Sequence, residues 1–122
     1  GVLINPMVVD GQVYGGTAQG LGTALYEEMV YDENGQPLST TLGDYLLPSA
    51  VEMPPIRIDH METPSPYTRF GQKGLGEGGA IGPPAAIANA INDALKDLGV
   101  TVDRLPMAPA RLFELIRAAG GK

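Results

Sequence analysis

The sequence predicts an α+β fold, in which a small mixed sheet packs with two or three helices as one lobe across residues 1–122. Short apolar stretches typical of strands occur at the start of the chain, in "IRIDHMET" (56–63) and in "VTVDRL" (100–105). Helical periodicity is strongest in the last third of the chain. The combination of both patterns in a chain of 122 residues favours a single small domain, or part of one.

The first third of the chain is expected to alternate strands and turns. "VLIN" (2–5) is typical of a strand, and a glycine-rich loop (11–22) then leads into a helix beginning at residue 23. The Asn-Gly pair at residues 34–35 indicates a tight turn, which we expect to join short strands around residues 29–31 and 38–42. A proline-containing connection without periodicity comes next.

The clearest helix is predicted to begin at Pro83. Apolar residues recur at helical spacing between residues 87 and 98, and Gly99 stands where a C-terminal cap belongs. A last helix is expected to open at Pro109 and to end at the glycines 120–121.

Composition excludes several classes of function. A formal net charge of -6 argues against a nucleic-acid partner, and the absence of cysteine excludes a thiolate-bound metal or cluster within this chain. His60 is the single histidine, and we expect a hydrogen-bonded or solvated surface role and no metal ligation. The sequence shows no signal peptide and no membrane span, so the expected location is the cytoplasm. Its abrupt start favours a piece of a larger polypeptide.

A second glycine-rich stretch, "GQKGLGEGGAIGPP" (71–84), surrounds Glu77 with residues that lack side chains. Gly74, Gly76 and Gly79 fit the spacing of a dinucleotide-binding fingerprint. That motif requires a preceding buried strand, a helix that opens inside it, and an acidic residue at a strand end about 20 residues later. None of the three is present, so a stand-alone nucleotide-binding domain is the weakest alternative.

Two interpretations remain for the glycine loops. In the simpler one, the glycines make turns, Glu77 is a solvated carboxylate and Gln19 is an exposed helix cap. In the other, residues without Cβ atoms let the backbone approach a ligand closely, with Glu77 directed at it as a general base and Gln19 in contact with it. Composition alone favours the simpler interpretation for Glu77.

Three blocks in register resemble a known family. They are "GQVYGGTAQGLGTALYEE", "TTLGDYLLPSAVEMP" and "KGLGEGGAIGPPAAIANAINDAL". In this order and spacing they resemble the C-terminal part of the molybdenum-binding large subunit of the xanthine dehydrogenase, aldehyde oxidase and carbon monoxide dehydrogenase family. The resemblance covers nearly the whole chain, which makes it far more specific than either glycine loop alone.

The resemblance implies a molybdenum ion held by molybdopterin, often as its cytosine dinucleotide in bacteria, with no metal ligand from the protein. It implies that Glu77 is the catalytic general base, which takes a proton as a water-derived oxygen attacks a substrate carbon. Gln19 and Gly20 match the block that lies against the cofactor. The same holds for the stretch before Glu77, which consists of Lys73, Gly74, Leu75 and Gly76.

The assembled enzyme would then oxidise an aldehyde, an N-heterocycle or carbon monoxide. Electrons would leave through [2Fe–2S] clusters and FAD on partner domains or chains, and the remainder of the molybdenum subunit would complete the pocket. The isolated chain should be inactive. The alternative is a scaffold or cofactor-handling lobe in which Glu77 has no catalytic role.

Overall fold

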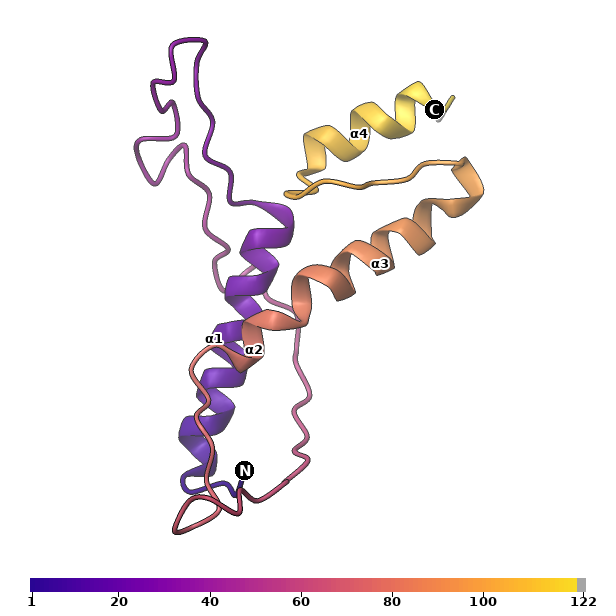
Figure 1. Ribbon diagram of the computed structural model, residues 1–122. Helices are drawn as coiled ribbons and strands as arrows, with labels where there is room; N and C mark the ends of the chain where they lie inside the picture. Colours follow the sequence, from indigo (N-terminus) through magenta and orange to yellow (C-terminus); the bar gives the residue numbers. More distant parts are fainter. Residues whose placement is uncertain (121–122) are drawn as a thin grey trace.

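The computed structural model describes residues 1–120, and its regular structure is helical. Its elements are α1 (Pro6–Leu25), α2 (Gly78–Ile81), α3 (Pro83–Leu95), a short 3₁₀ turn η1 (Lys96–Leu98) and α4 (Pro109–Ala118). Between α1 and α2 the chain runs out from one end of α1, turns back, and descends to the other end of the same helix (Figure 1). The expected helix end at Gly121 lies outside the described residues.

The expected mixed sheet is wrong. Within residues 1–120 the only β-type pairing is an isolated antiparallel bridge between Tyr31 and Pro37, around the predicted turn. The predicted strands at 56–63 and 100–105 pair with no strand in the described residues, and a helix side chain bonds instead to the backbone of one residue in each, Ile56 and Val102. Asn92 on α3, for example, accepts from Val102 N–H at 2.7 Å and donates to Val102 C=O at 2.9 Å. The described architecture is therefore α-helical with extended segments, not α+β.

The glycine-rich stretch 11–22 is also not a loop. It lies inside α1, a helix that begins at Pro6, where Asn5 Oδ1 caps Val8 N–H at 3.2 Å. Each glycine inside a helix costs about 1 kcal/mol relative to alanine. Tertiary contacts must offset that cost, since local propensity favours a loop.

Those tertiary contacts are formed where a glycine of α1 packs directly against a glycine of α2. A Cβ added to Gly16 would lie 2.7 Å from Gly79 Cα, and one added to Gly79 would lie 2.8 Å from the Val13 carbonyl oxygen. One turn further along α1, a Cβ on Gly20 would lie 2.8 Å from Pro83 Cβ. The missing side chains thus let α2 and the start of α3 lie directly against α1 (Figure 1).

The prediction for the last third of the chain is confirmed in its helices. α3 begins at Pro83, and Gly99 comes directly after η1 in the left-handed conformation with φ 66°. The small core lies here, built on the buried residues Val100, Val102 and Met107. Apolar side chains from α1, α3 and α4 pack around it: Leu25, Ile87, Ala88, Ile91, Leu95, Leu112 and Leu115.

Candidate functional site

Glu77 occupies the residue just before α2, where the chain meets α1. Its backbone (φ -112°, ψ 12°) lies outside the helical region, and its carbonyl accepts from Ala80 N–H at 2.9 Å. Its side chain is exposed and makes no capping hydrogen bond to α2. The Gly16–Gly79 contact, two residues further on, holds the backbone next to Glu77 against α1. Glu77 is therefore an anchored residue with a free carboxylate.

The stretch before Glu77, residues 73–76, has few interactions of its own. Within the described part of the chain no hydrogen bond involves a main-chain or side-chain group of these four residues. Gly74 and Gly76 have neither a positive φ nor any protein atom within 4 Å of the place where a Cβ would lie. Nothing in the described residues 1–120 therefore requires glycine at these two positions, and their backbone groups are open to an external partner.

Gln19 and Gly20 lie inside α1, on adjacent faces. Gly20 is buried against Pro83, whereas the Gln19 side chain is exposed. The Gln19 carbonyl accepts from Thr23 Oγ1 at 3.1 Å, as befits a residue within the helix. Gln19 is thus exposed, as the simpler interpretation expects, but it lies within the helix and does not cap it. Its amide has both donors and an acceptor to offer to a ligand.

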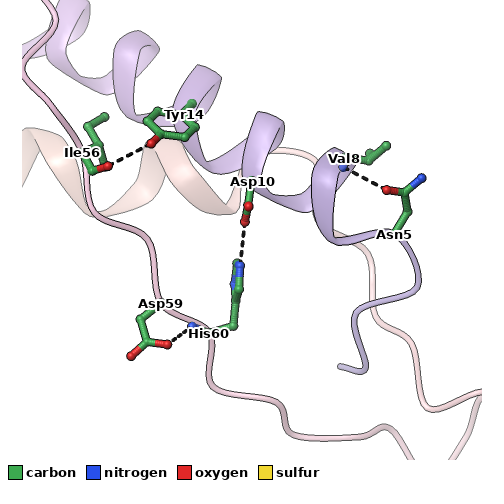
Figure 2. A network of polar contacts seen from close by, with 7 residues as sticks. All are labelled: Asn5, Val8, Asp10, Tyr14, Ile56, Asp59 and His60. Carbon is green, nitrogen blue, oxygen red and sulfur yellow. Dashed lines mark hydrogen bonds and ion pairs between the residues drawn. The ribbon is translucent and has the colours of Figure 1, made fainter.

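An extended segment runs alongside α1 and, together with residues 73–75, lines one hollow. His60 Nε2 lies 2.7 Å from Asp10 Oδ1, and Tyr14 Oη donates to the Ile56 carbonyl at 2.9 Å (Figure 2). Asp10 and Tyr14 are one helical turn apart, so both reach the same segment. His60 is accordingly a hydrogen-bonded residue, as expected, and its side chain is 26% exposed.

These contacts could not be found from the sequence, because Asp10 and His60 are 50 residues apart and neither stands in a recognisable motif.

In the described residues no group of three or more His, Cys, Asp or Glu side chains is arranged to hold a metal ion. Among these same residues, no helix is long and apolar enough to cross a membrane.

Comparisons with known proteins identify what this arrangement belongs to. The profile of the molybdopterin cofactor-binding domain matches residues 1–54. The gamma subunit of the 6-hydroxypseudooxynicotine dehydrogenase complex of Paenarthrobacter nicotinovorans is 53% identical over 93% of this chain. The carbon monoxide dehydrogenase large chain of Hydrogenophaga pseudoflava is 38% identical over 96% of it. The crystal structure of quinoline 2-oxidoreductase from Pseudomonas putida 86 superposes with a TM-score of 0.89 at 50% identity, covering 93% of this chain and 14% of that one.

These matches define the class as the molybdopterin-binding parts of molybdenum enzymes. More narrowly, the chain belongs to the family of molybdenum-binding large subunits found in xanthine dehydrogenases, aldehyde oxidoreductases and carbon monoxide dehydrogenases. The resemblance inferred from the three sequence blocks is thereby confirmed. The chain spans 14% of the length of the gamma subunit and 15% of that of the carbon monoxide dehydrogenase chain.

Proposed function

We propose that this chain forms one wall of the molybdopterin site in a molybdenum hydroxylase, with Glu77 as the catalytic general base. Gln19, Gly20 and residues 73–76 would lie beside the cofactor, which other segments of the subunit would complete. Support comes from the family of the chain and from the activities for which its relatives are named, which include nicotine 6-hydroxylase and carbon monoxide dehydrogenase. The substrate class proposed is an aldehyde, an N-heterocycle or carbon monoxide.

The observation that carries this proposal is the open backbone of residues 73–76. Two glycines there have no conformational or steric reason within the chain to be glycine, and the carboxylate of Glu77 comes directly after them. A bulky cofactor bound beside this stretch would explain both facts, because glycine at positions 74 and 76 leaves room for it close to the backbone. The residues present therefore fit a large, externally bound group.

The bound cofactor would supply the metal centre at which oxygen and electrons are transferred. This chain would supply the proton acceptor: a Glu77 carboxylate oxygen takes the proton released as oxygen is transferred to the substrate carbon. The contact between Gly79 and Gly16 holds the backbone just after Glu77 against α1, which would limit how much ordering the reaction requires of this residue. The exposed amide of Gln19 would donate to or accept from the cofactor's polar edge.

The proposal extends to groups outside this chain. We propose the cytosine dinucleotide form of the cofactor, and [2Fe–2S] and FAD centres on partner domains or chains that remove the electrons. The gamma subunit relative is by its name part of a complex, which supports further subunits in the assembled enzyme.

The decisive experiment is Glu77→Gln in the assembled enzyme that contains this chain. We expect molybdenum content to stay at the parent level and turnover to fall by at least about 10²-fold, because an amide cannot accept the proton. Glu114→Gln, the same chemical change at an exposed position of α4, serves as the control and should leave turnover unchanged. Turnover of the Glu77→Gln enzyme within tenfold of the parent would refute the catalytic role.

A further inference from the structure

We infer that the Asp10–His60 pair is a positioning device for the stretch that leads into Glu77, an inference that rests on the proposed function. The pair joins α1 to the extended segment through a 2.7 Å contact between His60 Nε2 and Asp10 Oδ1 (Figure 2). Neither residue is expected to touch the reacting atoms. Their proposed role is to hold the backbone that presents the cofactor-facing residues.

Residues 73–76 make no hydrogen bonds within the described residues. Their position therefore depends on packing and on the segments on either side of them. The segment on the C-terminal side is secure, because Gly79 lies in backbone contact with Gly16 of α1. The N-terminal side must therefore be secured by other contacts.

On that N-terminal side the chain continues from His60 through residues 61–64 into a loop that hydrogen bonds close before residue 73. Ser65 N–H donates to the Gly71 carbonyl at 2.9 Å, and Thr68 Oγ1 donates to the Gln72 carbonyl at 2.9 Å. These bonds close residues 65–72 into a compact loop whose entrance is the segment held by His60. Val2 N–H also donates to the Gly71 carbonyl, at 3.0 Å, so the loop is held at its far end as well.

The histidine segment and the cofactor-facing stretch also line one hollow. His60 and Met61 line this hollow of about 270 Å³ together with Lys73, Gly74 and Leu75, and Val9 and Val13 of α1 line it as well. His60 is therefore close to residues that are proposed to face the cofactor. The segments on both sides of the Glu77 stretch thus contact the same helix, α1. The contact before the stretch is His60 with Asp10, and the contact after it is Gly79 with Gly16.

The test compares His60→Ala with His60→Gln in the assembled enzyme. Glutamine places an amide nitrogen near the position of histidine Nε2, so it can still donate to Asp10. In His60→Ala we expect amide hydrogen exchange across residues 65–72 to accelerate about tenfold or more, with α3 unchanged. We also expect turnover to fall about tenfold or more at parent molybdenum content, with an altered molybdenum electron paramagnetic resonance signal. His60→Gln should restore all three readouts to within about threefold.

Asp10→Ala and Asp10→Asn provide a second route if His60→Ala does not assemble, since asparagine keeps an oxygen that accepts from His60. Lys96→Ala is the matched control, because it removes a 2.8 Å ion pair with Asp93 on α3, away from the Glu77 stretch. Parent-like exchange, signal and turnover in both His60→Ala and Asp10→Ala would overturn the inference. So would a loss of turnover that merely tracks lost molybdenum, or no rescue by glutamine. Failure of the proposed function shows differently, as an active Glu77→Gln enzyme.

Discussion

At the scale of single residues, the glycines of this chain serve two distinct purposes. Gly99 adopts φ 66°, a left-handed conformation that closes the helical run of α3 and η1. Gly76 has no positive φ and no protein atom near the place of its missing Cβ. The fold requires glycine at position 99, whereas nothing in the described residues requires it at position 76, as the proposed contact with a cofactor would explain.

This difference predicts opposite outcomes for one substitution at two sites. Gly76→Ala should change the free energy of unfolding of the assembled subunit by less than about 0.5 kcal/mol, yet lower its molybdenum content. Gly99→Ala should cost about 1–2 kcal/mol, because alanine is strained at this φ, and leave the molybdenum content per folded subunit unchanged. Denaturant unfolding and metal analysis of both variants are the measurements. Full molybdenum content in Gly76→Ala would contradict the proposed contact.

A second prediction at this scale concerns Asn92. Its side chain satisfies both backbone groups of Val102, a residue that is 5% exposed in the core. Asn92→Ala should lower the free energy of unfolding by about 2 kcal/mol, because it leaves a buried donor and a buried acceptor unpaired. Asn89→Ala, an exposed position on the same helix, is the control and should change it by less than about 0.5 kcal/mol. If both substitutions lowered the free energy of unfolding equally, the hydrogen bonds between Asn92 and Val102 would contribute nothing to stability.

At the scale of elements, the contact between α1 and α2 determines where Glu77 lies. Gly16→Ala should push the two helices apart, because its Cβ would lie 2.7 Å from Gly79 Cα and that neighbour is backbone. The neighbouring Gly15 has nothing within 4 Å of its Cβ position, so Gly15→Ala should instead stabilise α1 by about 0.5–1 kcal/mol. Turnover and unfolding of the two assembled variants test this. Turnover that survives Gly16→Ala at the parent rate would mean that the contact does not position Glu77.

The same contact explains why part of the fold was predictable and part was not. α3 was found from the sequence because its apolar spacing, its prolines and Gly99 all agree locally. The glycine-rich part of α1 was predicted as a loop because its helical state depends on α2, which lies far along the chain. The prediction of strands at 56–63 and 100–105 was wrong because the sequence does not show what pairs with an extended segment. Here Tyr14 and Asn92 bond to backbone groups of these segments, and no neighbouring strand in the described residues does so.

For the candidate site, the three sequence blocks led to the family, and the family is confirmed. The roles of Glu77, Gln19 and residues 73–76 remain predictions. No local pattern could have linked Asp10 to His60, since a hydrogen bond between residues 50 positions apart exists only once the chain has folded. Sequence therefore indicated the chemistry, whereas the support around it had to come from the structure.

At the scale of the whole molecule, the chain exposes more surface than its mass requires. Its accessible surface is 8851 Å², whereas a compact monomer of 12.8 kDa exposes about 6,300 Å². Large apolar side chains are among the most exposed, with Val51 at 90%, Tyr67 at 95% and Met61 at 96%. The largest fully buried side chain is a single methionine, Met107. Such a surface fits a lobe that is covered by other parts of a subunit.

The isolated chain should therefore fold weakly and be inactive. We expect it to bind a hydrophobic dye, to unfold over a broad temperature range and to show no turnover, because its core is small and its proposed site is incomplete. Dye fluorescence, calorimetry and an activity assay on the purified chain test this. Cooperative unfolding without dye binding would contradict the structural argument, and turnover by the lone chain would contradict the incomplete site.

The two attachments of the Glu77 stretch to α1 have one more consequence. The covalent path from α1 to that stretch runs through the exposed turn at Asn34 and Gly35, but none of the contacts that place Glu77 passes through this turn. A protease cut there in the assembled subunit would divide the polypeptide without disturbing the site. For the same reason, two separately synthesised halves should reassemble the proposed site through non-covalent contacts alone. The contacts with α1, and not the covalent connection through residues 34–35, hold the two parts together.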